Sequence, residues 1–240
     1  DIKGAWVNLK LPDVEHSNLS NVEWWVVGRY LADGHRGTRG DFFISVGRDK
    51  KEEFETMAAP YIGTVAKHEA LQYRLKNVSE ALKDMLCKCG QGAANKQVPI
   101  EGVCLAQEKA GFLLDGYLSG DGNKTGNATS ASSVSRALLL GMAMVAQRAR
   151  GVIASVFGSK PAGKHVIQER EVNQRQLWVM SWRDSSHHHH GVILNDGAWK
   201  KVSVIEEKGT AETWSIQVAG DASFTAEGCI VKNCPLQIDI

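Results

Sequence analysis

The sequence lacks long apolar runs and has almost no excess of charge of either sign. None of its apolar stretches approaches the roughly 18 residues that a membrane-spanning helix requires. Residues 1–6 show no basic segment followed by an apolar one, so we do not expect a signal peptide. With 43% apolar residues, 23% charged residues and a formal net charge of +1, the composition is ordinary for a soluble protein. A chain of 240 residues can bury one or two hydrophobic cores.

Cysteine is also scarce. The five cysteines are scattered along the chain, at positions 87, 89, 104, 229 and 234. An odd, dispersed set in a protein of this size argues against a disulfide framework and favours a reducing compartment, so we expect a cytoplasmic protein. The Cys87-x-Cys89 pair has no second pair at the spacing of a zinc site, which favours two residues at the end of a helix.

The positive charge is concentrated in one part of the chain. Residues 136–183 contain eight Lys or Arg and two acids, a net charge of +6, which leaves −5 for the remainder of a chain whose total is +1. A basic stretch inside a neutral chain fits the electrostatic footprint of phosphate contacts. Charge alone predicts a solvated basic face equally well.

A nine-residue pattern occurs twice, 88 positions apart. Residues 26–34, Val-Val-Gly-Arg-Tyr-Leu-Ala-Asp-Gly, align without gaps on residues 114–122, Leu-Asp-Gly-Tyr-Leu-Ser-Gly-Asp-Gly. Both copies have a glycine at the third position, Gly28 or Gly116, and both end in Asp-Gly. Because glycine has no Cβ, it lets two helix backbones approach closely. The repeat therefore predicts two closely packed helices, each of which brings one carboxylate to the same place.

We call the contact between these two helices the seam. The acids of the two copies, Asp33 and Asp121, would repel each other at this seam unless a cation lies between them. Mg²⁺ favours carboxylate and water ligands. A metal held by paired acids beside a basic, strand-rich surface indicates phosphodiester hydrolysis, in which the metal activates water and stabilises the leaving oxygen. One copy alone would be an amphipathic helix that ends in a common Asp-Gly turn. Two copies in the same register favour the metal site.

The hydrophobic patterns around the two copies predict the same order of elements, helix, strand, helix, strand, and so a duplicated domain with an internal pseudo-two-fold axis. Helices are expected at 20–33, 49–61, 79–89, 107–119 and 134–149, and strands at 39–46, 67–77, 151–157 and 173–182. Ser20 and Glu23 fit a capping box, and Gly34 is expected to end the first helix in the left-handed conformation. Residues 122–133, rich in Gly, Asn, Thr and Ser, are expected to form a loop. From residue 191, short strands at 192–194, 199–204, 213–218 and 229–231 predict a small all-β segment.

Both copies resemble the LAGLIDADG motif, and residues 16–183 resemble a monomeric, two-repeat LAGLIDADG homing endonuclease. The resemblance implies an α+β fold of two pseudo-symmetric αββαββ repeats, whose saddle-shaped antiparallel sheets lie along the DNA major groove. It implies that Asp33 and Asp121 bind the catalytic Mg²⁺, with Mn²⁺ or Ca²⁺ as alternative occupants. The backbone carbonyls of Ala32 and Gly120 are then further metal ligands.

The same resemblance implies how DNA is read and cut. Polar side chains on solvated strand faces read base edges in the major groove. Candidates for this role are Gln72, Arg74, Lys76, Gln174 and Gln176. Lys96-Gln97-Val98-Pro99 resembles the Lys-x-x-Pro block that precedes the second motif in intein-embedded members, which implies that Lys96 assists cleavage. Asp115, at the second position of the second motif, either weakens the helix seam or faces outward.

Residues 192–234 resemble the C-terminal splicing segment of an intein (Hint) domain, because two strands and an Ala-Glu-Gly turn precede Asn233-Cys234. In that family the last Asn cyclises and cleaves the chain, and the following Cys accepts the upstream segment as a thioester. Lys232 stands where a His usually assists the cyclisation, so we expect slow cyclisation. The chain shows neither an initial Cys or Ser nor a Thr-x-x-His block, so we expect a separate N-terminal intein fragment, a removed segment or a relic tail.

The predicted organisation has six segments. They are a lead-in at 1–15, the first repeat at 16–100, the second repeat at 101–184, a linker at 185–191, the splicing segment at 192–234 and the start of a host protein at 235–240. The linker contains His187–His190, to which we assign no function.

The sequence thus predicts a monomeric, Mg²⁺-dependent, site-specific endonuclease of double-stranded DNA, associated with an intein and encoded by a prokaryote or phage. Two alternatives stay open. A maturase-like LAGLIDADG protein would bind DNA or RNA without cleavage, although both acids are intact. A trans-splicing partner would contain the nuclease only incidentally.

Overall fold

The computed structural model describes residues 6–9, 11, 14–67, 71–167, 170–183, 191–194, 197–202, 209–210, 223–226 and 229–232. The chain divides into two compact units. The central unit comprises Asp13–Ser185, and the terminal unit combines Asp1–Pro12 with Ser186–Ile240. Both ends of the chain therefore belong to one unit, and the central unit is inserted between them in the sequence.

The first half of the central unit alternates helices with β-hairpins. Its elements are α1 (Asn21–Asp33), β2 (Gly34–Arg36), β3 (Phe42–Val46), the short 3-10 helix η1 (Arg48–Lys50), α2 (Lys51–Met57), η2 (Ala59–Tyr61), β4 (Ile62–Lys67), β5 (Leu71–Leu75) and α3 (Glu80–Lys88). The four strands form one antiparallel sheet in the order β2-β3-β5-β4.

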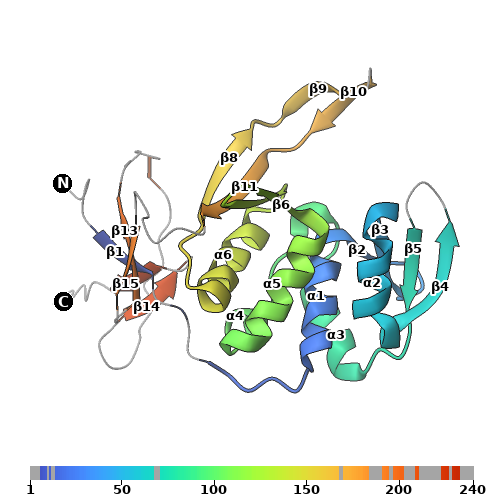
Figure 1. The fold of residues 1–240 in the computed structure, drawn as a ribbon. Helices are drawn as coiled ribbons and strands as arrows, with labels where there is room; N and C mark the ends of the chain where they lie inside the picture. Colours follow the sequence, from blue (N-terminus) through green and yellow to red (C-terminus); the bar gives the residue numbers. More distant parts are fainter. Residues whose placement is uncertain are drawn as a thin grey trace, which may run out of the picture. The chain divides into compact units, whose positions relative to one another are not determined.

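The second half repeats this plan after a connection through η3 (Ala93–Asn95) and α4 (Ile100–Val103). Its elements are α5 (Gln107–Asp121), β6 (Gly122–Thr125), β7 (Ala128–Ser133), α6 (Arg136–Arg150), β8 (Ser155–Lys160), β9 (Gly163–Ile167), β10 (Arg170–Gln174) and β11 (Leu177–Arg183). The antiparallel sheet β6-β7-β11-β8 has the same order of first, second, fourth and third strand as the sheet of the first half. The β9–β10 ribbon continues from β8 and β11 (Figure 1).

The hairpins correct the sequence analysis at several places. Residues 122–133, predicted to be a loop, form β6 and β7, because Gly126 takes a positive φ of 60° at the turn and the polar segments pair across it. The strand β4 at Ile62–Lys67 begins before the predicted strand 67–77. The predicted strand 173–182 is interrupted between β10 and β11, and its register shifts between Leu177 and Trp178.

The start of α1 follows the prediction, and its end does not. The Ser20 side chain accepts a hydrogen bond from the Glu23 N–H, and the Glu23 carboxylate accepts one from the Ser20 N–H at 2.8 Å, so the capping box is confirmed. Gly34, however, is extended, with φ −83° and ψ 153°, and not left-handed. Its N–H still donates to the Tyr30 carbonyl, and the chain enters β2 without an intervening turn.

The hydrophobic core surrounds α1 and α5, which lie side by side in the middle of the central unit (Figure 1). Buried aromatic side chains join the helices to the first sheet, among them Trp25 and Tyr30 of α1, Phe54 of α2 and Tyr73 of β5. Each aromatic ring removes a large apolar area from water, so these contacts hold the helix pair on the sheet. The core thereby fixes where the C-terminal ends of α1 and α5 lie.

The terminal unit is built from strands in the part that the structure describes. β1 (Trp6–Leu9) and β12 (Gly191–Leu194) both pair antiparallel with β13 (Gly197–Lys201), and β14 (Ser223–Ala226) pairs with β15 (Cys229–Lys232). Residues 1–15, predicted to be a lead-in, thus contain a strand of this unit. The predicted strand 213–218 and His187–His190 lie outside the described residues.

Within the described residues, no helix combines the length and the apolar character needed to cross a membrane.

Candidate functional site

The candidate site lies at the C-terminal ends of α1 and α5. A Cβ atom at Gly28 would overlap the backbone carbonyl oxygen of Leu113, and one at Gly116 would overlap that of Trp25. Because a helix backbone cannot move aside as a flexible side chain can, only glycine permits this distance between the two helices. The close approach predicted from the repeated glycines is confirmed.

The last turns of the two helices meet. A Cβ atom built at Gly120 of α5 would overlap the Cβ of Ala32 in α1 and would lie 2.9 Å from a carboxylate oxygen of Asp33. Asp121 follows Gly120 directly and is the last residue of α5, as Asp33 is of α1. The two acids are therefore presented at the same end of the seam, and both are only partly buried.

The surroundings of Asp121 oppose its negative charge. Burial, followed by the negative charge of Asp33, raises the pKa of the Asp121 carboxyl to about 6, against the positive charges of Lys96, Arg29 and Lys50. The mutual repulsion expected of two acids at one seam is thus present. A further cation close to both carboxylates would stabilise their ionised form.

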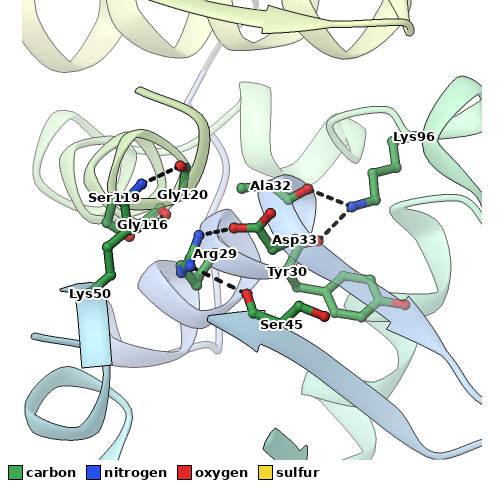
Figure 2. Close-up of polar contacts among 10 residues, drawn as sticks. All are labelled: Arg29, Tyr30, Ala32, Asp33, Ser45, Lys50, Lys96, Gly116, Ser119 and Gly120. Atoms are coloured by element: carbon green, nitrogen blue, oxygen red, sulfur yellow. Dashed lines mark hydrogen bonds and ion pairs between the residues drawn. The ribbon is translucent and has the colours of Figure 1, made fainter. Parts of the chain in front are cut away.

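Two lysines contact the carbonyls that precede the acids. The Lys96 ammonium donates to the carbonyl oxygen of Ala32 at 2.9 Å and to that of Tyr30 at 3.1 Å. The Lys50 ammonium donates to the carbonyl oxygen of Gly120 at 2.5 Å. Figure 2 shows the two lysines on opposite sides of the group. Each half of the site therefore has one lysine on the carbonyl before its acid.

Lys96 is held firmly in this position. Its side chain is buried, with 7% exposed, and the Ser135 hydroxyl donates to its backbone carbonyl at 2.6 Å. Burial lowers the pKa of the Lys96 ammonium, while the charges of Asp121 and Asp33 raise it. Lys96, predicted from its Lys-x-x-Pro context, therefore lies at the candidate site and interacts with both acids.

A third cation, Arg29, lies inside the seam. Its side chain is 1% exposed, and its guanidinium forms an ion pair with the Asp33 carboxylate one turn later in α1 (Figure 2). It also donates to the Ser45 carbonyl at 3.4 Å. A Cβ atom at Gly120 would overlap this guanidinium, so the glycine leaves the space that the arginine fills.

Tyr117 occupies the register position of Arg29 in the second copy. It is fully buried, and its hydroxyl has no hydrogen-bond partner among the described residues. Burial raises the pKa of this hydroxyl, and the charges of Asp121 and Asp33 raise it further. An unpartnered buried hydroxyl close to two carboxylates is costly, and it leaves one polar atom available to a ligand at this site.

The donor atoms fit a hard divalent cation. Two carboxylates and the carbonyls of Ala32 and Gly120 supply only oxygen, which Mg²⁺ and Ca²⁺ prefer. Over the ranges that the structure describes, no cluster of three or more His, Cys, Asp or Glu residues forms a metal-binding group. A metal held by Asp33 and Asp121 would consequently complete its shell with backbone, water or phosphate oxygens.

The first three predicted base-reading residues lie in or next to β5. The Nε2 atom of Gln72 is 3.2 Å from the Nε2 atom of His35 on β2. Arg74 is exposed and forms an ion pair with Asp41 at 2.7 Å. Lys76, which follows the strand, is also exposed. The first sheet thus presents a row of polar groups to solvent.

The other two residues do not share a strand face as predicted. Gln174 is the last residue of β10, opposite Gly163. Gln176 lies in the two-residue break before β11, and its amide donates to the carbonyl of Leu177 at 3.1 Å. The break removes the alternation on which their common orientation depended.

Asp115, the departure from the motif pattern, faces outward. Its side chain is 52% exposed and forms an ion pair with Arg150 of α6 at 2.5 Å. Of the two outcomes left open by the sequence, a weakened seam or an outward-facing side chain, the structure has the second.

The sequence analysis missed three residues of the site. The sequence could have identified Arg29, because a charged residue stands inside an apolar helix pattern four positions before an acid. Tyr117 gave a weaker signal, as the residue aligned with Arg29. Lys50 gave none, because its contact with Gly120 joins residues 70 positions apart.

The predicted splicing residues Asn233 and Cys234 lie outside the described residues. Lys232 is the last residue of β15, where its backbone pairs with Ser223 of β14.

Several solved structures resemble this chain at low sequence identity. Mesophilic variants of the homing endonuclease I-DmoI match with a TM-score of 0.45 and 13% identity over 69% of this chain and 84% of that one. I-DmoI in complex with DNA and Mn matches with 0.43 and 11% over 69% and 90%. The N-terminal LAGLIDADG domain of WhiA matches with 0.43 and 8% over 68% and 74%.

No protein-family model matches the sequence, and neither does any curated protein at a significant level. All three structural matches have TM-scores below 0.5.

Proposed function

We propose that the central unit is a divalent-metal-dependent endonuclease of double-stranded DNA, built from two LAGLIDADG-type repeats. The observation that carries this proposal is the meeting of Asp33 and Asp121 at the ends of two helices packed through Gly28 and Gly116. In the absence of a cation this arrangement is unfavourable, because each carboxylate disfavours the ionisation of the other. Divalent metal bound at these carboxylates would relieve that cost.

In the proposed enzyme, the Asp33 and Asp121 carboxylates are the ligands that the two helices supply for divalent metal, and the carbonyl oxygens of Ala32 and Gly120 are further ligands. When bound, Mg²⁺ supplies an activated water and stabilises the leaving oxygen of the phosphodiester. Buried surroundings strengthen these electrostatic effects, because they are screened less than in bulk water.

Lys96 and Lys50 place positive charge on either side of the two acids. Their ammonium groups contact the carbonyls of Ala32 and Gly120, at 2.9 Å and 2.5 Å. A phosphate that enters between the two helix ends would lie near both ammonium groups. Positive groups already held in place stabilise the charge that develops on the phosphate during cleavage.

DNA would be bound by the two antiparallel sheets. The polar row on β5 and the exposed basic residues of the stretch 136–183 would supply phosphate and base contacts on both halves. The halves share a strand order but differ in residues, so a target with roughly two-fold layout and two different half-sites is expected.

The central test compares three Asp-to-Asn variants on a randomised duplex library from which cleaved products are captured in Mg²⁺. Asp33→Asn and Asp121→Asn should abolish double-strand cleavage while DNA binding, measured in Ca²⁺ by mobility shift, survives. Asp115→Asn is the matched control, because this acid lies on α5 but is exposed and paired with Arg150. Full cleavage by the first two variants, or its loss in the control as well, would remove the metal assignment.

A non-cleaving nucleic-acid-binding protein is the second candidate. The observation that favours it is the ion pair between Arg29 and Asp33, which already compensates one of the two acids. The library experiment separates the candidates, because a pure binder shifts duplexes or RNA without releasing any cleaved product in Mg²⁺ or Mn²⁺.

For the terminal unit we propose an intein-like splicing segment that uses Asn233 and Cys234. Its support is the pairing of β1 with β13, which joins residues from both ends of the chain in one small β unit with the central unit inserted between them. A chain that combines these two functions would contain the nuclease as an insertion in the sequence of a splicing domain.

The splicing proposal is tested by mixing the full chain with N-terminal intein fragments that begin with Cys and contain a Thr-x-x-His block. A ligated product that forms with wild type but not with Asn233→Ala would support it. No ligation or C-terminal cleavage with any fragment, under reducing conditions over a day, would refute it without touching the nuclease proposal.

A further inference from the structure

The two halves of the seam differ at one register position. Arg29 of α1 and Tyr117 of α5 occupy the fourth position of the two nine-residue copies, and each is buried four residues before its acid. Residues at this spacing face each other on a helix surface. Asp33 therefore has a cation as its neighbour, and Asp121 has a neutral ring.

On the Asp33 side a positive charge is built into the protein. The Arg29 guanidinium is 1% exposed and pairs with the carboxylate of Asp33. An arginine does not lose its proton at accessible pH. A metal that displaced it from Asp33 would leave a buried guanidinium without its partner, which is strongly unfavourable.

On the Asp121 side no such cation is attached. Within the described part of the chain, the Asp121 carboxylate makes neither an ion pair nor a side-chain hydrogen bond, and the Tyr117 hydroxyl also lacks a partner. The Asp121 carboxylate at the end of α5 is thus available to a metal. The Lys50 ammonium contacts the neighbouring Gly120 carbonyl and lies on the opposite side of the labelled residues from Lys96 (Figure 2).

A second difference accompanies the first. The residue before the acid is alanine in α1 and glycine in α5, and a Cβ at Gly120 would overlap the Arg29 guanidinium. Gly120 therefore makes room for the arginine in the seam. Two positions in different copies are matched to each other, which indicates that the buried cation is part of the design of the site.

We propose that Arg29 takes the place of one divalent cation beside Asp33, so that this chain binds a metal preferentially through Asp121 and cuts one DNA strand before the other. The inference rests on the proposed nuclease function and adds a strand bias to it. Arg29 acts here as a positioning residue, because it sets the charge of Asp33 and touches no reacting atom.

Metal binding is the first test, and it needs no DNA cleavage. Mn²⁺ is titrated into the full wild-type chain, and free Mn²⁺ is followed by electron paramagnetic resonance. We expect one tight Mn²⁺ per chain and a second at least tenfold weaker. Asp121→Asn should remove the tight ion, while Asp33→Asn should change its dissociation constant less than threefold.

Removing the internal cation should make the halves alike. In Arg29→Met the second Mn²⁺ should bind within about threefold of the first, while Arg29→Lys should keep the wild-type inequality. The double variant Arg29→Met/Asp33→Asn, which removes both charges of the pair, controls for folding and should bind a single ion. Two equal Mn²⁺ sites in wild type, loss of the tight ion in Asp33→Asn, or no bound Mn²⁺ would each overturn the inference.

Strand bias is the second readout. The substrate is an intact duplex of a sequence that the library experiment selects, with a different fluorophore on each strand. Wild type should nick one strand at least tenfold faster than the other, and Arg29→Met should nick both strands at nearly equal rates. Equal strand rates in wild type would overturn the inference while the nuclease function stands. Unequal Mn²⁺ sites without cleavage of any DNA would refute the nuclease function and leave the metal inequality intact.

Discussion

The Asp121 carboxyl is less stable as an anion in the folded chain than in water. Its pKa rises to about 6 from the ordinary value of 3.8, chiefly because it is buried. A raised pKa means that the folded protein holds the proton more tightly than the unfolded chain. The resulting stability is fully present below about pH 4 and is lost as the pH rises through 6. At neutral pH the ionised acid therefore destabilises the metal-free protein.

Asp121→Asn should consequently stabilise the protein while it removes the proposed activity. Above pH 7 we expect the free energy of unfolding to exceed that of wild type by about 2–3 kcal/mol, the equivalent of a shift of about two pKa units. Near pH 4 the two proteins should be equally stable, because the acid is then neutral. Urea denaturation in metal-free buffers at pH 4 and pH 8 measures both values. An Asn variant that is less stable than wild type at pH 8 would contradict the conclusion that the ionised Asp121 carboxylate destabilises the metal-free protein.

Lys50 and Lys51 are neighbours with different surroundings. Lys50 contacts the Gly120 carbonyl at 2.5 Å, whereas Lys51 is 53% exposed and pairs with Glu55 at 3.7 Å. Lys50→Met should slow cleavage by about 100-fold, the scale of removing one preorganised donor to developing charge. Lys51→Met, which loses the same charge one residue away, should cleave at the wild-type rate. Single-turnover rates with Mg²⁺ decide the comparison, and equal losses in both variants would assign Lys50 only a general electrostatic effect.

At the scale of elements, the seam between α1 and α5 tolerates no side chain at its glycines. Gly116→Ala places a Cβ against the Trp25 carbonyl, so we expect the free energy of unfolding to fall by about 1–3 kcal/mol. Gly111 lies in the same helix with no atom within 4 Å of an added Cβ. Gly111→Ala should instead raise the free energy by about 0.5–1 kcal/mol, because alanine favours the helix. Urea denaturation separates the two, and effects of the same sign would refute the close seam.

The elements also mark what the sequence could predict. The helix pair followed from Gly28, Gly116 and the two Asp-Gly ends, because all of that information is local and occurs twice. The hairpin at 122–133 did not follow, because its Gly, Asn, Thr and Ser residues have weak strand propensity and β7 is held by pairing with β11. The left-handed end expected at Gly34 failed for a similar reason, since tertiary pairing carries the chain directly into β2.

The site shows the same limit at the scale of single contacts. Asp33, Asp121 and Lys96 were found from a repeated motif and a short block. Lys50 reaches Gly120 only through the folded arrangement of two halves. Arg29 belongs to the nine-residue motif itself, but its role depends on the space that Gly120 leaves for its guanidinium. This match between Arg29 and Gly120 exists only when the two helices are packed together.

At the scale of the whole molecule, the near-zero net charge conceals an uneven distribution. The stretch 136–183 carries +6 in a chain whose total is +1. Part of this charge is exposed at the junction between the second sheet and the β9–β10 ribbon, at Lys160 and Arg175. Other exposed lysines sit on helices beside carboxylates, as Lys83 does with Glu80 at 2.6 Å. We expect Lys160 and Arg175, at the junction, to contact phosphates and Lys83 not to.

Salt dependence distinguishes these two kinds of charge. Each phosphate contact releases counterions, so the slope of log affinity against log salt concentration changes by about 0.9 per contact on duplex DNA. The double variant Lys160→Gln/Arg175→Gln should therefore bind a 30-bp duplex with a slope smaller by about two. Lys51→Gln/Lys83→Gln, with the same loss of charge on α2 and α3, should leave the slope unchanged. Fluorescence anisotropy between 50 and 300 mM salt, with Ca²⁺ in place of Mg²⁺, measures both slopes. Equal changes in the two variants would mean that net charge, and not the position of Lys160 and Arg175, governs DNA binding.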